Sequence, residues 1–200
     1  MNTLEDLKQS YRKYKWFLTS SGKLVLGGKS ATQNDELLHK VTKSGKELVV
    51  MHTSHPGSPF TVILADANKL SKKDLHECAV FTGSFSRAWK QHKQKIDVHI
   101  FLSSQLYKNK EMAVGTWGVS PKVEKMDITL ELVLTKQKGI LRAVPRESVK
   151  SKSQLLLVVS PGKVDKQDLL PKLSMALKDA FSQEEILSAL PAGGVKILKV

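Results

Sequence analysis

The chain has 200 residues, and 40% of them are hydrophobic, which suits one packed domain with an appendage and excludes a disordered chain. Its 32 Lys and Arg residues against 19 Asp and Glu residues give a formal net charge of +13 at pH 7. A balance this basic favours a polyanionic partner, with nucleic acid first and an acidic membrane surface second. The open alternative is a basic surface that only maintains solubility.

The distribution of charge and cysteine narrows the class further. Residues 1–150 carry a net charge of +11 and residues 151–200 only +2. Cys78 is the single cysteine, so no internal disulfide can form, and it lies on the apolar face of a predicted helix. Acids at Glu5 and Asp6 occupy the place where a signal peptide has bases, and no apolar run reaches the ~20 residues that span a bilayer. We therefore expect a soluble, cytoplasmic protein.

The chain is predicted to begin with a helix over residues 3–14, followed by a β-hairpin. Two short apolar runs, Trp16–Thr19 and Lys23–Leu26, flank the small polar turn Ser20-Ser21-Gly22, which is the pattern of a hairpin. Gly27-Gly28 then ends the second strand.

A helix over residues 30–43 is predicted next. Ser30 and Gln33 have the spacing of a capping box, and the apolar residues that follow recur at helical spacing. Lys29 and the free N–H groups of this helix start form a candidate pocket for a phosphate or another anion. Asn34 and Gln33 lie in the first turn, where they can add hydrogen bonds, although the capping box would use Gln33. A phosphate-binding loop that ends at Ser30 would need a glycine where Lys23 stands, so ATP or GTP binding is not predicted.

Two strands are predicted over residues 47–52 and 60–64. His52 ends the first strand, and the loop between the strands contains His55 and Ser58. The two histidines are a two-ligand fragment with no third ligand nearby, so no metal site is predicted. We interpret them as hydrogen-bond donors beside the glycine turn or as RNA contacts. A rival interpretation is catalysis at this loop, but no paired carboxylates or nucleophile elbow accompany it.

The longest predicted helix covers residues 72–93, with Ser71 as its cap. Its apolar face is expected to be core. Arg87 lies near its end, where its guanidinium suits a phosphate and equally suits a structural ion pair.

The rest of the chain has the pattern of strands followed by a small mixed tail. Strands are predicted over residues 98–102, 113–119 and 128–134, the last with strict alternation of apolar and polar residues. The tail is predicted to consist of a strand over 155–159, a turn at Pro161-Gly162, a helix over 167–181, a helix capped by Ser182 and a strand over 195–200. A unit of this size buries little surface alone, so it should pack on the main domain.

Three motifs resemble, in this order, the RNA-binding NFACT-R domain of the NFACT proteins, which are similar to the bacterial fibronectin-binding-protein-A-like family. Trp16–Asp35 matches Trp-Phe-x-x-Ser-x-Gly-x-Leu-Val-x-Gly-Gly-[Lys/Arg]-x-Ala-x-Gln-Asn-[Glu/Asp]. His52–Ile63 resembles the family's His-x-x-x-His-Gly-[Ala/Ser]-Pro segment, with Pro56 inserted or substituted in the loop, and Ala79–Trp89 resembles its long helix. The resemblance covers about residues 11–135.

One edge of the domain departs from the family pattern. Gly115–Val119 resembles the family's Gly-Ser-Phe-x-Ile strand, but the usual Ser-Lys-Thr segment before it reads Tyr107-Lys108-Asn109-Lys110. The Gly-Lys-[Lys/Arg]-Asn run after it reads Ser120–Lys125, which lacks the glycine and the asparagine but keeps positive charge at Lys122.

The sequence thus predicts an α+β fold, with a mixed or antiparallel sheet that carries the long helix on one face. We expect an NFACT-R-like RNA-binding domain at residues 1–145, with its N-terminal helix at 1–14, and a small β-α-α-β C-terminal extension at residues 146–200. The predicted RNA-binding residues are Lys29, Gln33, Asn34, His52, His55, Ser58, Arg87, Lys108, Lys110 and Lys122.

The resemblance implies RNA binding in ribosome-associated quality control. The expected partners are tRNA, rRNA and the large ribosomal subunit, with no membrane partner, no cofactor, no metal and no catalysis. The alternatives are an RNA-processing or RNA-modifying enzyme that uses the His52/His55 loop, and a protein–protein adaptor that uses its tail. No oligomeric state is predicted.

Overall fold

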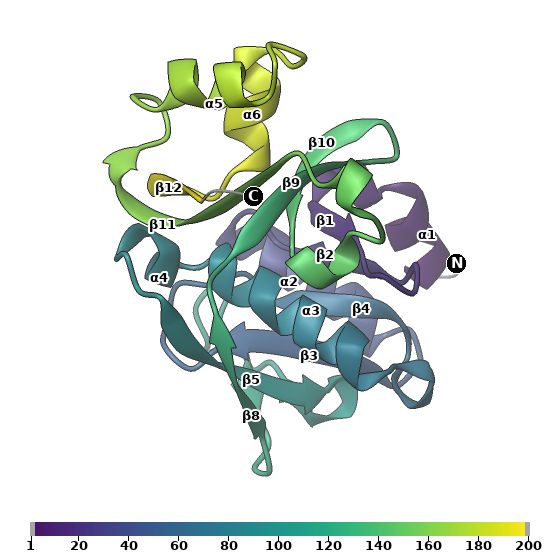
Figure 1. Cartoon of the computed structure of the whole chain (residues 1–200). Coiled ribbons are helices and arrows are strands. Elements are labelled where there is room, and N and C mark those ends of the chain that lie inside the picture. The colour runs from purple at the N-terminus through teal and green to yellow at the C-terminus, as the bar shows by residue number, and fades with distance from the viewer. Residues whose placement is uncertain (1–2, 199–200) are drawn as a thin grey trace.

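The structure, a computed structural model, describes residues 3–198 and has an α+β fold with two main antiparallel sheets in that range (Figure 1). Its strands are β1 (Lys15–Leu18), β2 (Leu24–Gly27), β3 (Leu48–Thr53), β4 (Thr61–Asp66), β5 (Lys95–Leu102), β6 (Leu106–Tyr107), β7 (Gly118–Val119), β8 (Glu124–Thr129), β9 (Leu132–Gln137), β10 (Ile140–Val144), β11 (Leu157–Asp165) and β12 (Gly194–Leu198). One sheet has the order β1-β2-β4-β3-β5-β8, the other β10-β9-β11-β12, and β6 pairs with β7. The predicted fold class is confirmed.

The helices lie between these strands and at their ends. They are α1 (Thr3–Gln9), α2 (Ala31–Thr42), α3 (Lys72–Ser84), α4 (Arg87–Lys90), α5 (Leu170–Ala176) and α6 (Gln183–Ala189). Short 3-10 turns occur at Tyr11–Lys13, Ala67–Lys69, Ser103–Gln105, Arg146–Ser148 and Lys152–Gln154.

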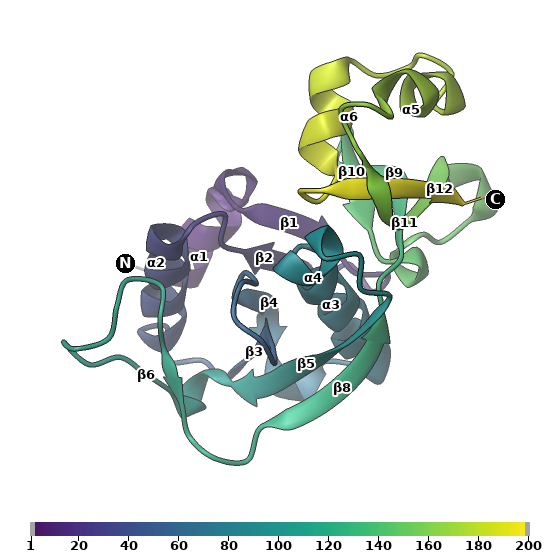
Figure 2. The ribbon, with the colours of Figure 1, turned by 90° about the vertical axis from the view of Figure 1, so that its left-hand side faces the viewer.

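The six-stranded sheet carries helices on both faces. Successive side chains of a strand point to opposite faces, so neighbouring residues enter different cores. Phe17 packs with α3, and its ring centroid is 4.6 Å from that of Phe81, whereas Trp16 belongs to the cluster that α1 and α2 cover. The four-stranded sheet joins the cluster around α3. Figure 2 shows α3 within the curve of the larger sheet.

The predicted hairpin and the following helix are confirmed. β1 and β2 pair in register with Trp16 opposite Leu26, and the Ser30 hydroxyl accepts a hydrogen bond from the Gln33 N–H at 3.2 Å to cap α2. The N-terminal helix is shorter than predicted. It ends at Gln9, where the Ser10 N–H and hydroxyl both donate to the Asp6 carbonyl, and the chain then forms a 3-10 turn over Tyr11–Lys13.

The single helix predicted over residues 72–93 is wrong, because it breaks at Phe85-Ser86. The Ser71 capping box is present, but α3 ends at Ser84. The Ser86 hydroxyl donates to the Gly83 carbonyl at 2.6 Å and accepts from the Ala88 N–H at 3.1 Å, so Ser86 ends one helix and caps the next. Arg87 is therefore the first residue of α4.

Two of the later predicted strands are also different in the structure. Residues 113–117 form a loop, and β7 alone remains of the strand predicted over 113–119, since Gly115 turns the chain with a positive φ of 80°. The run predicted as one strand over residues 128–134 divides between β8 and β9, which belong to different sheets. The alternation of buried residues holds for Ile128, Leu130 and Leu132 and ends at Val133, which is buried as well.

The C-terminal extension has the predicted β-α-α-β order, but its sheet begins earlier. β11 pairs with β9 on one side and β12 on the other, so the four-stranded sheet crosses residue 145, and the division of the chain there stays a prediction. Pro161 and Gly162 lie inside β11, at an irregularity of register, rather than in a turn. The helix predicted over 167–181 is limited to α5, and the Ser182 capping box is confirmed. The last two residues of the strand predicted over 195–200 lie outside the described range.

Two buried carboxylates of α3 hold the turn of the hairpin. Asp74 accepts hydrogen bonds from the hydroxyls of Thr19 and Ser21, and Glu77 accepts them from the Ser20 N–H at 2.8 Å and the Ser20 hydroxyl. Glu77 also accepts from the Ser148 hydroxyl at 2.7 Å, beyond β10. Asp74 is 1% exposed and Glu77 0%. Buried carboxylates need such partners, so this network joins the hairpin, α3 and the segment after β10.

Acid should weaken the fold through Asp74. Burial raises its pKa, but hydrogen bonds from Ser21, Ser71 and Thr19 outweigh burial and lower it to about 2 from 3.8. Because the folded pKa is the lower one, this stabilisation is complete above pH 4 and is lost as the pH falls through 2. We expect wild type to lose about 2 kcal/mol of unfolding free energy between pH 5 and pH 2 through this group. Urea unfolding of wild type and Asp74→Asn measures it, and parallel pH profiles would contradict it.

Candidate nucleic-acid interface

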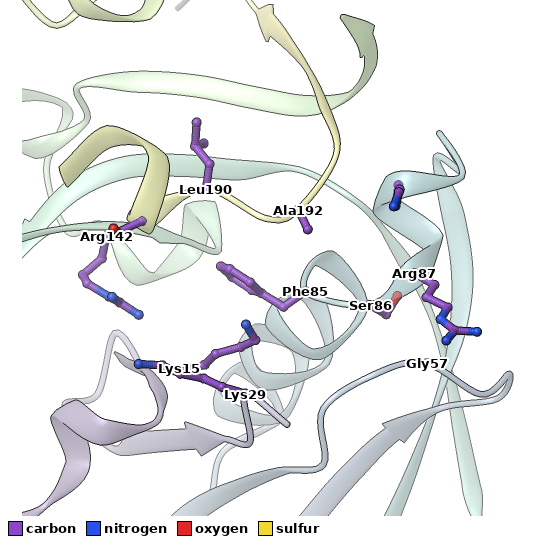
Figure 3. Close-up of a pocket in the computed structure, with 11 residues that line it drawn as sticks. Lys15, Lys29, Gly57, Phe85, Ser86, Arg87, Arg142, Leu190 and Ala192 are labelled. Atoms are coloured by element: carbon purple, nitrogen blue, oxygen red, sulfur yellow. The ribbon is translucent and has the colours of Figure 1, made fainter. Parts of the chain in front are cut away.

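Five cationic side chains line one pocket of about 310 Å³, which we call the cationic pocket. They are Lys15, Lys29, Arg87, Lys90 and Arg142. The other lining residues are Gly57, Phe85, Ser86, Ser188, Leu190 and Ala192, so no acidic side chain is among the described residues that line it. Figure 3 shows Lys15, Lys29 and Arg142 on one side of Phe85, with Arg87 beside Gly57 on the other. The last three lining residues come from α6 and the segment after it.

The hairpin and the second sheet place three of these cations together. Lys15 pairs with Gly27 across the hairpin, so the chain that leaves β2 carries Lys29 to the same edge. The Lys15 ammonium lies 5.3 Å from the ring centroid of Phe85. Arg142 reaches this edge from β10, where its guanidinium donates to the Trp16 carbonyl at 2.8 and 3.1 Å and lies 4.7 Å from the centre of the Trp16 ring.

Burial and mutual repulsion disfavour the charged forms of the cations in this pocket. Burial lowers the pKa of Lys15, and the positive charges of Lys29, Arg142 and Lys166 lower it further. Burial and Arg142 lower the pKa of Lys29, and burial lowers the pKa of Arg142 to about 10. A bound anion would relieve both the desolvation and the repulsion, so the pocket has the electrostatics of an anion site.

Gly57 fixes the loop before β4 against α4. The Arg87 N–H donates to the Gly57 carbonyl at 2.8 Å, and a Cβ atom added to Gly57 would clash with the Arg87 Cδ. Gly57 also has a φ of 101°, which side chains other than glycine rarely adopt. The loop therefore needs glycine here, and the Arg87 side chain lies directly over it.

A second hollow of about 600 Å³ adjoins the first at Gly57 and Arg87, which line both. We call it the histidine pocket, because His52, His55 and His99 are in its wall. The other side chains that concern us here are Asn34, Ser58, Phe60, Phe101 and Trp117. His52 and His99 are opposite each other in the register of β3 and β5, and the His52 ring centroid is 4.5 Å from that of Phe60.

A family model described as the NFACT protein RNA binding domain matches residues 13–120, more than half of the chain. The chain belongs to this family. The resemblance that the three sequence motifs predicted is therefore confirmed. The matched range contains four of the five cations of the cationic pocket, and Arg142 lies outside it.

Two known proteins are similar to this chain. The archaeal Rqc2 homolog aRqcH of Methanocaldococcus jannaschii is 30% identical over 200 residues, which cover 94% of this chain and 29% of that protein. The chain thus spans less than a third of the length of this relative. The solved C-terminal part of the fibronectin/fibrinogen-binding protein (FBPS) from Streptococcus suis has a similar fold, with a TM-score of 0.51 at 23% identity, over 58% of this chain and 45% of that one.

The structure brings together most of the residues predicted from the NFACT motifs. Lys29 and Arg87 line the cationic pocket. The histidine pocket contains Asn34, His52, His55, Ser58 and again Arg87. Arg87 makes no ion pair within residues 3–198, so the alternative of a structural ion pair does not apply to it.

The other predicted residues are placed differently. The Gln33 amide accepts from the Lys29 N–H at 2.8 Å and donates to the Lys13 carbonyl at 3.2 Å, so it supports the chain before α2. Lys108 pairs with Asp35 at 3.2 Å and donates to two carbonyls of its own loop. Lys110 and Lys122 lie outside both pockets. As RNA contacts, all four stay predictions.

Sequence reasoning missed Lys15, Lys90, Arg142 and His99. Lys15 directly precedes the Trp-Phe pair and is one of several bases there, which gives it no distinguishing signal. Arg142 lies in a hairpin that was not predicted, and its turn, Lys138-Gly139, has positive φ at both residues. The Lys-Gly pair between two apolar runs was the signal that could have revealed it.

The loop from His52 to Ser58 does not have the arrangement of a catalytic or metal site. The His52 Nδ1 donates to the Thr53 carbonyl at 2.7 Å, and the Ser58 hydroxyl accepts from the Thr53 N–H at 3.0 Å, so both groups support the loop backbone. Within residues 3–198, no three His, Cys, Asp or Glu side chains are grouped as a metal site would require, and no helix has the length and apolarity to cross a bilayer.

Polyvalent anions should stabilise the protein through the cationic pocket. Because Lys15, Lys29 and Arg142 repel one another, we expect millimolar tripolyphosphate to raise the Tm by roughly 2–4 °C. Lys15→Met keeps the aliphatic contact with Phe85 but removes one charge, so its Tm should be higher without the anion and should rise less with it. Lys43→Met, at the exposed end of α2, is the matched control. Equal rises in the two variants would argue against an anion site.

Proposed function

We propose that this chain binds RNA through the cationic pocket. The observation that carries the proposal is the convergence of five cations, with no acidic lining residue in the described structure, on one concave site of an NFACT RNA-binding domain. Phosphates dominate the affinity of basic proteins for nucleic acid, and Arg and Lys are the side chains that bind them. Such a pocket suits one bend of a phosphodiester backbone, since its cations surround a single space.

We further propose that the RNA is tRNA or large-subunit rRNA, that the chain acts in ribosome-associated quality control, and that it works in the cytoplasm at the large ribosomal subunit. The similarity to an Rqc2 homolog supports the role in ribosome-associated quality control, and it extends over 94% of this chain. Binding without catalysis is supported by the loop geometry, in which the His52 Nδ1 and the Ser58 hydroxyl are engaged with the backbone of Thr53.

Lys29→Glu should weaken RNA binding several-fold with little change in Tm. The substitution puts a negative charge in the cationic pocket, whereas the Lys29 N–H that bonds Gln33 is unaffected. A carboxylate just before a helix is favourable to the helix dipole, so α2 should remain stable. Lys43→Glu makes the same charge change at the far end of α2 and serves as the control. Titration of labelled tRNA measures both, and equal losses would mean that net charge alone governs binding.

Salt should weaken binding in proportion to the phosphates engaged. Each contact contributes a slope of about −0.7 to −0.9 in log affinity against log salt, so three to five contacts give about −2 to −4.5. The Lys29→Gln variant should reduce the slope by about 1. Titrations between 50 and 300 mM KCl would measure both slopes, and an affinity that does not change with salt would remove the phosphate-binding proposal.

A further inference from the structure

The histidine pocket has the walls of a site for a flat aromatic ligand. Its volume of about 600 Å³ falls within the range of ligand sites. Phe60, Phe101 and Trp117 line it, and the His52 ring packs against that of Phe60 with a tilt of 39° between the ring planes. Proteins that bind unpaired RNA bases stack them on aromatic and histidine rings of this kind.

The same pocket contains hydrogen-bonding groups that bond no described residue. The Nε2 of His99 is buried and has no partner within residues 3–198. The Asn34 Oδ1 accepts from the Phe60 N–H at 3.3 Å, and the amide nitrogen of Asn34 bonds no residue of the described chain. A buried polar group without a partner is rare and costly in folded proteins, so a ligand that completes the His99 Nε2 is favoured.

The neutral forms of His52 and His99 suit an uncharged ligand that both donates and accepts hydrogen bonds. Burial lowers the pKa of His52, and burial followed by Lys125 lowers that of His99. Both rings are therefore neutral at pH 7, and each then has one donor and one acceptor nitrogen. Nucleobases present both kinds of group along their edges.

The cationic pocket and the histidine pocket adjoin each other, as the phosphate and the base of one nucleotide do. Gly57 and Arg87 line both, so a phosphate beside Arg87 has the cationic pocket on one side and the histidine pocket on the other. A paired base is stacked inside its helix and cannot enter such a hollow, whereas an unpaired base can turn out of the strand.

We infer that the histidine pocket binds the base of an unpaired nucleotide whose phosphate lies in the cationic pocket. This inference rests on the proposed RNA binding and deepens it, because it makes the preferred substrate a bulged or single-stranded RNA rather than a continuous duplex. The phosphates supply affinity that is independent of sequence, and the base supplies the preference for unpaired RNA.

Three RNAs test the inference on the full chain. They are a perfect duplex, the same duplex with one bulged adenosine, and the same duplex with an abasic bulge, which keeps the phosphates and the bend but has no base. We expect the adenosine bulge to bind about tenfold more tightly than the abasic bulge. A 2-aminopurine in the bulge should also lose fluorescence on binding, because its ring would stack in the pocket.

His99→Leu is the sharpest variant, since the Nε2 that it removes has no hydrogen bond to lose within the described chain. It should bind the abasic RNA as wild type does but lose the preference for adenosine. His55→Ala, at an exposed lining residue, should reduce the same preference. His76→Leu is the matched control, because His76 faces Glu147 at 3.2 Å, away from both pockets.

The possible outcomes separate the inference from the proposed function. Equal wild-type affinity for the adenosine and abasic bulges would overturn the base site while RNA binding stands. A preference for adenosine that persists in both His99→Leu and His55→Ala would also overturn it. Failure of all three RNAs to bind at low salt would overturn the proposed function itself, and the inference with it.

Discussion

The buried carboxylates of Asp74 and Glu77 are the constraint on which the rest of this structure depends. Both project from α3 into the core and are almost inaccessible to solvent. Carboxylates in such a place are stable only when hydrogen bonds surround them, and here the turn of the β1–β2 hairpin and Ser148 provide those bonds. A slip of the hairpin by one residue would remove the bonds from Thr19, Ser20 and Ser21, and would leave Asp74 with Ser71 alone and Glu77 with Ser148 alone. The network therefore fixes the hairpin against α3, and it fixes the chain after β10 against the same helix.

The cationic pocket is a consequence of that constraint. Lys15 lies on the hairpin, Arg87 on the helix that follows α3, and Arg142 on β10, so the elements that the two carboxylates join are the ones that carry the cations. Gathering these charges costs free energy, as the lowered pKa values of Lys15 and Arg142 indicate. The stacking of Arg142 on Trp16 and of Lys15 on Phe85 offsets part of that cost. A bound phosphate would offset the rest of this free-energy cost, which favours its binding.

Local signals in the sequence were sufficient for the elements that they specify and insufficient for the tertiary arrangement. The hairpin turn, the glycine pair and the caps at Ser30, Ser71 and Ser182 all predicted elements that are present. The break at Ser86 was missed because its hydroxyl bonds were not distinguishable from those of a serine inside a helix. The strand over residues 128–134 was misread because its alternation continues where the chain passes from one sheet to the other. Part of the cationic pocket depends on that passage, since it leads to Arg142.

The loop from His55 to Ser58 shows how a local sequence signal contributes to the tertiary arrangement. His52 and His55 were interpreted as hydrogen-bond donors beside the glycine turn or as RNA contacts, and the structure shows why the turn needs glycine. Gly57 has a positive φ and lies under the Arg87 side chain, so the loop and the start of α4 occupy one fixed position relative to each other. That position places Gly57 and Arg87 in the walls of both the cationic pocket and the histidine pocket. The His55–Ser58 loop thus fixes the cationic pocket and the histidine pocket relative to each other, and with them the proposed sites for a phosphate and its base.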